Sequence, residues 1–253
     1  MKYLFTVIVS LLIAASALAR ESAPPGRTVL DIIPFALKEG KDISDFMALR
    51  ESFASTIEKT GGTYYASVLT PLFVDRSATG IAPEFDAIWL GAAPSPTDFA
   101  KAHADYLKIG GETEAVFAHV RTNLQRMMMA TEMIHLREMS ADDPNVMMLS
   151  TCSPVGDADM QTISAELRTI SKAMADKGAL GSTFLWHSGL GIPSGLEGKY
   201  IYARRFRSFA AWGTSMNLYR SGEFSEEVQA RQAVMSCGSP RVYTSEAFYW
   251  PED

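Results

Sequence analysis

VMMLSTC, residues 146–152, is the first of four stretches that decide the fold. The other three are TFLWHS (183–188), YIYARRF (200–206) and VYTSEAFYW (242–250). All four are short, largely apolar runs, and this composition predicts β-strands. Between the first two lies the most regular helical pattern of the chain, in which apolar residues recur at spacings of three and four. Its members are Met160, Ile163, Leu167, Ile170 and Met174.

Two more helical stretches separate the third and fourth of these strands. The first covers 208–219, and Gly222 then breaks the pattern. The second begins at Ser225, which is followed by two glutamates as in a typical first turn, and continues to Val234. The predicted order of this half is therefore β-α-β-β-α-β, with its second helix interrupted by glycine.

The first half of the chain repeats this order. Apolar and aromatic runs predict strands at 29–36 (VLDIIPFA), 63–74, 85–90 and 127–136. A helix that opens at Asp42 places four apolar residues on one face. They are Phe46, Leu49, Phe53 and Ile57. A second helical region covers 98–124 and is broken at Gly110 and Gly111.

The fold class that follows is α+β: two tandem ferredoxin-like β-α-β-β-α-β modules, each of about 110 residues, a normal domain size. We expect the first module at 28–139 and the second at 146–253. Residues 140–145 lie between them and include the polar, proline-containing run Asp142-Asp143-Pro144-Asn145. This composition is typical of a linker.

The first residues of the chain have the three parts of a secretory signal peptide. Lys2 supplies a positive charge, an apolar run follows at 4–13, and Ala17-Leu18-Ala19 fits the small-x-small cleavage pattern. We therefore expect 1–19 to be removed on export to a periplasm or the outside of the cell, and 20–27 to be a flexible lead-in. No later stretch is long and apolar enough to span a membrane.

The composition argues against one class of partner. The net charge is −6 over 253 residues, and the basic residues form no block. Nucleic acid binding needs clustered lysine and arginine, so we expect no nucleic acid partner. The 13 methionines and the 10% of aromatic residues suit an apolar interior that could hold a small apolar or aromatic ligand.

The two cysteines, Cys152 and Cys237, are predicted to form a disulfide in an oxidising compartment. A ferredoxin-like sheet usually has the strand order 4-1-3-2, so the end of strand 1 meets the start of strand 4. Cys152 ends the first strand of the second module, and Cys237 lies just before its last strand. The topology, drawn without reference to the cysteines, thus brings them together.

The doubled β-α-β-β-α-β order resembles that of the dimeric α+β barrel superfamily, over nearly all of the chain after the signal peptide. The resemblance implies two sheets that face each other as a barrel, with helices outside. A ligand would lie between sheet and helices or inside the barrel. Members include monooxygenases of polycyclic aromatics, haem-binding enzymes and muconolactone-type isomerases, so the fold does not decide the function.

The richest cluster of aromatic and ionisable residues lies on two strands of the second module. Its members are Trp186, His187, Tyr200, Tyr202, Arg204 and Phe206. As a functional site, the aromatic residues would line a pocket, Arg204 would hold an anionic group, and His187 would act as acid/base or haem ligand. The alternative is a packed sheet with a hydrogen-bonded histidine and an exposed arginine.

The other motifs are weaker. His103, His119 and His135 lack a metal-ligand partner three or four residues away on a helix, so we expect no metal site. Glu132 and His135 are three apart on a predicted strand, which places them on opposite faces. GLGIPSG (189–195) leads into a strand rather than a helix, and therefore predicts a hairpin loop rather than a phosphate site.

Two main functions remain open, beside a third possibility of partner binding through an exposed strand edge. The first is a binding or structural protein whose apolar, aromatic and methionine-rich interior holds a small molecule or nothing. The alternative is a monooxygenase-like or haem-dependent enzyme with its site in the second module, at His187, Arg204 and Tyr202. No motif names a cofactor, and a tandem chain can close its own barrel alone or pair with a second copy.

Overall fold

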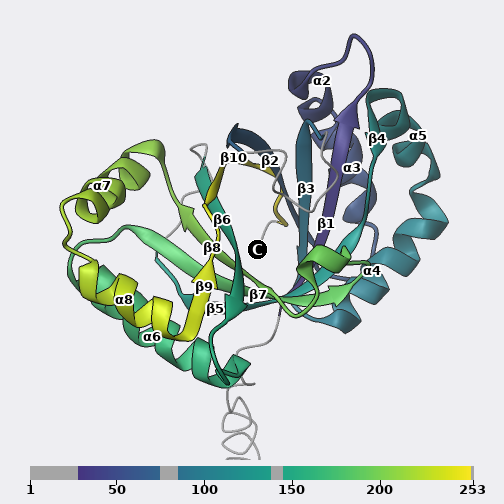
Figure 1. The fold of residues 1–253 in the computed structure, drawn as a ribbon. Coiled ribbons are helices and arrows are strands. Elements are labelled where there is room, and N and C mark those ends of the chain that lie inside the picture. Colours follow the sequence, from purple (N-terminus) through teal and green to yellow (C-terminus); the bar gives the residue numbers. More distant parts are fainter. Residues whose placement is uncertain (1–27, 75–84, 138–144, 252–253) are drawn as a thin grey trace, which may run out of the picture.

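The computed structural model describes residues 28–74, 85–137 and 145–251. The predicted signal peptide, the lead-in and residues 140–144 of the linker lie outside these ranges, and Asn145 opens a strand. In the described part, eight strands close into a barrel with helices on its outside (Figure 1). The α+β class and the barrel are therefore confirmed.

The barrel strands follow one another around the ring as β10, β2, β3, β1, β5, β7, β8 and β6, and β6 pairs with β10 to close it. Their bounds are β1 (Thr28–Leu37), β2 (Tyr65–Phe73), β3 (Ala87–Ala93), β5 (Met127–His135), β6 (Asn145–Pro154), β7 (Gly181–Leu190), β8 (Tyr200–Phe206) and β10 (Arg241–Tyr249). Each coincides with a strand predicted from the sequence. Two short strands, β4 (Arg121–Asn123) and β9 (Met235–Cys237), pair with the far ends of β1 and β6.

The helices lie outside the barrel, α2 to α5 over the first half and α6 to α8 over the second (Figure 1). Their bounds are α2 (Ile43–Met47), α3 (Arg50–Ile57), α4 (Pro96–Ile109), α5 (Gly111–Val120), α6 (Met160–Asp176), α7 (Phe209–Arg220) and α8 (Ser225–Val234). Among the helices in the described ranges, none is both long and apolar enough to cross a membrane.

The structure corrects two of the helix predictions. The single helix expected from Asp42 is two helices, because the chain breaks between α2 and α3, and the Asp42 side chain caps only the first. The helical region expected to reach residue 124 ends at Val120, and Arg121–Asn123 leave it as β4. A strand of three residues is too short for hydrophobic periodicity to reveal.

The strands of the two halves are arranged in the same order. The first half runs β2-β3-β1-β5 across the sheet, and the second runs β7-β8-β6-β10. Numbered within each half, both orders read 2-3-1-4, which is the 4-1-3-2 order of a ferredoxin-like sheet seen from its other edge. The two groups join at β5–β7 and at β2–β10.

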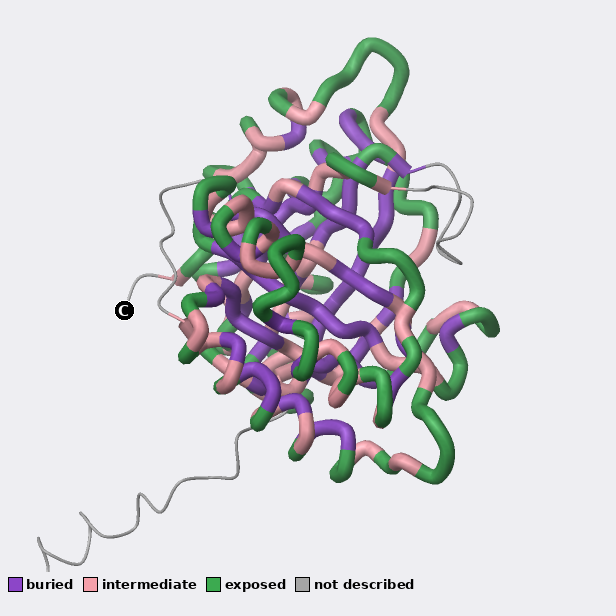
Figure 2. The backbone as a smooth tube through the Cα atoms, turned by 60° about the vertical axis from the view of Figure 1, so that its left-hand side comes forward, coloured by how far each residue is buried: buried purple, intermediate pink, exposed green. Residues whose placement is uncertain are grey.

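The inner face of the barrel is a packed apolar core. All eight barrel strands contribute buried side chains to it, among them Leu30, Leu69, Ile88, Met129 and Trp186. Figure 2 shows buried backbone along the crossing strands, whereas the exposed segments lie mainly in loops and helices. The space left inside is about 30 Å³, about the volume of one water in the liquid. Of the two ligand positions that the resemblance implied, the barrel interior is therefore filled.

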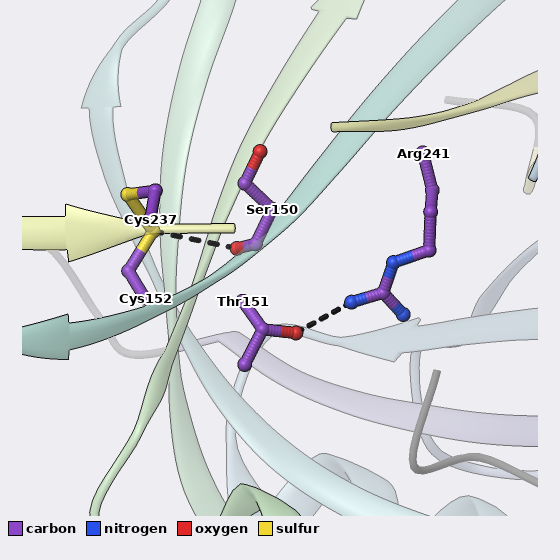
Figure 3. The surroundings of a disulfide bond; sticks show 5 residues. All are labelled: Ser150, Thr151, Cys152, Cys237 and Arg241. Carbon is purple, nitrogen blue, oxygen red and sulfur yellow. Dashed lines mark hydrogen bonds between the residues drawn. A yellow bond between two sulfur atoms is a disulfide. The ribbon is translucent and has the colours of Figure 1, made fainter. Parts of the chain in front are cut away.

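The disulfide joins β6 to β9 (Figure 3). Cys152 and Cys237 are direct partners across this pair of strands, as the predicted topology required. Two further contacts hold the same place: Gly238 donates its backbone N–H to the Thr151 carbonyl at 2.9 Å, and Arg241 Nη2 donates to Thr151 Oγ1 at 2.6 Å. The end of β9 is therefore fixed against the sheet.

Replacing both cysteines by serine (Cys152→Ser with Cys237→Ser) should lower the free energy of unfolding by about 2–4 kcal/mol. The bridge joins residues 85 apart, and its loss frees the unfolded chain from that constraint. Urea unfolding followed by circular dichroism measures the change. The wild-type protein with its disulfide reduced should match the double variant, whereas a double variant as stable as the oxidised wild type would contradict this role.

Candidate functional site

Two cavities of about 380 Å³ each lie between the outer face of the sheet and the helices, one in each half. This size is within the range of about 300–1,000 Å³ typical of small-molecule pockets. Each cavity opens where the chain passes from a short strand to the following barrel strand, from β4 to β5 or from β9 to β10. Between its short strand and its barrel strand, the chain forms no ladder pair with β1 or β6.

The first cavity contains a network of polar side chains in which Asp31, Tyr64 and Trp89 are buried and Arg126 is partly exposed. Asp31 accepts two hydrogen bonds from the Arg126 guanidinium, both at 2.8 Å. Tyr64 donates its hydroxyl to Asp31 Oδ2 at 3.0 Å, and Trp89 Nε1–H donates to the Tyr64 oxygen at 3.0 Å. Each of these hydrogen bonds has a defined donor and acceptor, and together they hold Tyr64 and Trp89 in place at the cavity wall.

Local sequence explains how this network fits on the sheet. Asp31 faces Gly91 across β1 and β3. A Cβ atom at Gly91 would lie 1.8 Å from the Tyr64 hydroxyl oxygen, so only glycine leaves room for the tyrosine to reach the aspartate. Burial and the Asp31 charge raise the pKa of Tyr64 well above its usual value, and the phenol stays protonated as a donor.

Arg121 is the most unusual residue of the first cavity. Its side chain is 6% exposed, and its Cζ lies over four aromatic rings. These rings belong to Phe35 (5.1 Å), Phe46 (5.0 Å), Trp89 (5.3 Å) and Phe117 (4.8 Å). Within the part of the chain that the structure describes, neither Nε nor Nη1 of Arg121 has a hydrogen-bond partner.

The guanidinium of Arg121 remains charged at neutral pH. Burial lowers its pKa to about 10, and nearby Glu114 opposes this shift. Glu114 also lines the cavity and accepts a hydrogen bond from the Tyr106 hydroxyl at 3.0 Å. The aromatic faces supply cation–π attraction but no hydrogen-bond acceptor. Two N–H groups of this guanidinium, buried beside the cavity, therefore have no acceptor among the described residues.

The remaining wall combines aromatic and aliphatic side chains. Phe53 and Phe99 line it together with His103, whose ring stacks on Phe99 with the ring centroids 5.7 Å apart. Burial, and the Arg126 guanidinium 3.5 Å from its Nδ1, lower the pKa of His103, so the imidazole is neutral at pH 7. A flat apolar ligand can stack on such a wall.

The second cavity contains two of the residues predicted from the sequence. Tyr202 and Arg204 line it, and Arg231 lies close by with its Cζ 5.3 Å from the Tyr202 ring centroid. Apolar contacts come from Met148, Met216 and Tyr219. One wall is formed by residues 237–240, which begin at the disulfide cysteine Cys237.

The other predicted site residues lie elsewhere. Trp186 points into the barrel core, and Phe206 is fully buried beneath the Arg204 guanidinium. His187 lines neither of the two large cavities: its ring is edge-on to Tyr200, and its Nε2 is 3.7 Å from Glu132 Oε2. The catalytic role proposed for His187 stays a prediction.

Sequence reasoning missed the first cavity entirely. One signal was present, because Asp31 is the only charged residue of the apolar run VLDIIPFA. An acid in a strand that is otherwise buried requires a partner, which here is Arg126. Arg121 gave no such signal, because the sequence predicts a helix there and the structure has the boundary between α5 and β4.

The described residues hold no group of three or more histidine, cysteine, aspartate or glutamate side chains that could bind a metal ion. Their cavities also do not fit a histidine-ligated haem. No histidine lines the second cavity, where the Met148 sulfur already accepts the Trp212 indole N–H at 3.3 Å. In the first, the only histidine is His103, and the cation beside its Nδ1 opposes a positively charged iron.

Comparison of the sequence with family models and with curated proteins finds no match. Solved structures do match. A proposed monooxygenase from Lactobacillus acidophilus has a TM-score of 0.54 at 13% identity, covering 88% of this chain and 95% of that one. A proposed monooxygenase from Fusobacterium nucleatum has a TM-score of 0.54 at 10% identity, covering 88% and 94%. A proposed chlorite dismutase has a TM-score of 0.50 at 12% identity, covering 88% and 96%. These similarities show a shared fold of the dimeric α+β barrel type.

Substituting Gly91→Ala should displace Tyr64 and lower the free energy of unfolding by about 1–3 kcal/mol, because the new methyl group overlaps the phenol. Urea unfolding measures it. Gly213→Ala is the matched control: it lies within α7, its Cβ would meet no atom within 4 Å, and alanine favours helix. Equal stability of the Gly91→Ala variant and the wild type would contradict the packing described here.

Proposed function

We propose that this protein binds a small, neutral aromatic molecule in the first cavity and recognises an oxygen atom on it through Arg121. The supporting observation is the buried guanidinium with unused N–H groups. Burying hydrogen-bond donors without acceptors is costly. A ligand oxygen would accept from the N–H groups of Arg121, which the surrounding aromatic rings cannot do. Recognition of the ligand oxygen then depends on Arg121.

The charge of the cavity indicates the class of ligand. The charged residues that line it are Asp31, Glu114, Arg121 and Arg126, two of each sign, so the lining is balanced when His103 is neutral. A balanced lining gives no net attraction for an anion. The ligand class that fits is therefore a flat aromatic molecule with a carbonyl or hydroxyl oxygen, stacked on rings such as Phe53 and Phe99.

The matched ligands 1-tetralone and tetralin test this proposal, since they differ in one carbonyl oxygen. Titration calorimetry on the mature chain should show tetralone binding at least about tenfold more tightly, because only the ketone accepts from Arg121. Arg121→Met should remove this preference and leave tetralin binding largely unchanged.

Arg50→Met is the control variant, because Arg50 is on α3, lies outside the cavity lining and makes a half-exposed ion pair with Glu246. It should keep the preference for tetralone. Equal affinity for the two ligands in the wild type, or an unchanged preference in Arg121→Met, would contradict the proposed recognition.

A second candidate is a monooxygenase-like enzyme at the same cavity. The observation that favours it is again Arg121, since an unpaired guanidinium at an apolar site would stabilise an oxyanion that develops on a bound phenol. The fold similarity to two proposed monooxygenases agrees with this candidate. The sequence placed the enzyme site in the second half instead, at His187, Arg204 and Tyr202.

Oxygen uptake in the presence of 1-naphthol tests the enzyme candidate. The wild type should consume oxygen, and Arg121→Met should slow consumption by about a hundredfold or more through loss of oxyanion stabilisation. Arg50→Met serves again as control. If the wild type binds 1-naphthol without consuming oxygen, the binding function alone stands.

We also infer that residues 1–19 direct export and that 28–139 and 146–253 form two ferredoxin-like modules joined at 140–145. The matching strand order of the two halves supports the modules. The disulfide is consistent with an oxidising compartment such as a periplasm or the outside of a cell.

A further inference from the structure

The second cavity differs from the first in its charge. Its described lining contains two arginines, Arg204 and Arg231, and no aspartate or glutamate. The lining therefore carries two positive charges in a chain whose net charge is −6. Such an excess of positive charge in a concave site attracts anions.

Neither arginine is neutralised by the protein. Arg204 is 5% exposed, and its Cζ lies 4.9 Å from the Phe206 ring centroid. Arg231 lies over the Tyr202 ring, and its buried Nε lacks a hydrogen-bond partner among the described residues. In the same described ranges, no carboxylate comes within 4 Å of either guanidinium, although other half-buried cations such as Lys177 have one.

One wall of the second cavity, residues 237–240, is held against the sheet. The Cys152–Cys237 disulfide attaches its first residue to β6 (Figure 3). The Gly238 N–H bond to the Thr151 carbonyl fixes the next residue. Ser239 of this wall and Ser150 of β6 add two hydroxyl groups to the lining, and both can bond to an anion. A wall that is already fixed lowers the entropic cost of binding, because it does not have to be ordered by the ligand.

We propose that the second cavity binds a small organic phosphate, with the phosphate on Arg204 and Arg231 and the apolar body against Met148, Met216 and Tyr219. A phosphate monoester carries about −1.5 to −2 charges at neutral pH, which matches two guanidinium groups. Arginine forms paired hydrogen bonds to phosphate oxygens, and its planar shape suits this contact. The proposal uses different residues from the first cavity and does not depend on the function proposed there.

Titration calorimetry of the full mature chain with phenyl phosphate tests the proposal. One molecule should bind per chain, with affinity that falls as salt increases. Arg204→Met and Arg231→Met should each weaken binding by about tenfold or more, since each removes a charge-assisted contact. Arg220→Met is the control, because Arg220 is exposed on α7 and outside the lining. Circular dichroism of each variant shows whether it is folded as the wild type is.

Inorganic phosphate separates the two parts of the ligand. It should bind at least about tenfold more weakly than phenyl phosphate, because it has no apolar body to bury. Equal binding of the two would overturn the organic part of the proposal. Absence of phenyl phosphate binding, or unchanged binding in Arg231→Met, would overturn the site itself. Arg231 is only half-buried, so this variant decides the matter even if Arg204→Met fails to fold.

Discussion

Closure of the sheet is the constraint on which the rest of this structure depends. β10 pairs with β2 on one side and with β6 on the other, so none of the described barrel strands keeps an open edge. The inner face is then enclosed, and apolar side chains from all eight strands pack in it. The polar networks described above lie on the outer face, under the helices. Both cavities lie there, and a function through an exposed strand edge has no support in the described barrel.

The two halves use the same framework for different chemistry. Asp31 and Met148 each occupy the fourth position of the first strand in their half, and they face Gly91 and Arg204 respectively. Arg121 and Met235 each open the short strand of their half. The first half thus has an acid and a buried arginine where the second has methionines, and the second has an arginine where the first has glycine. One cavity is balanced in charge and the other is positive.

The sequence predicted the scaffold better than the sites. The strands could be found because runs such as VYTSEAFYW differ clearly from the helical pattern around Leu167, and the disulfide followed from the strand order. Strand alternation puts Tyr202 and Arg204 on one face of YIYARRF, and both line the second cavity. It could not show that Trp186, on the neighbouring strand, faces the opposite way into the barrel core.

The first cavity could not be predicted because its parts are distant in the chain. Asp31 and Arg126 are 95 residues apart, and Arg121 lies at the end of a helix whose boundary no pattern marked. A single sequence gives the period of an element but not which side chains meet across a closed sheet. Asp31 within an apolar strand was the one local sign of a buried network.

The proposed binding function depends on a hydrogen bond from Arg121 to an oxygen atom of the ligand. Nuclear magnetic resonance of the arginine Nε–H group, with Arg121→Met used to assign the signal, observes this directly. The Arg121 signal should move downfield when 1-tetralone is added and stay in place with tetralin, because only the ketone accepts a hydrogen bond. Binding of 1-tetralone with no change in this signal would show that the ligand is held elsewhere and would contradict the account.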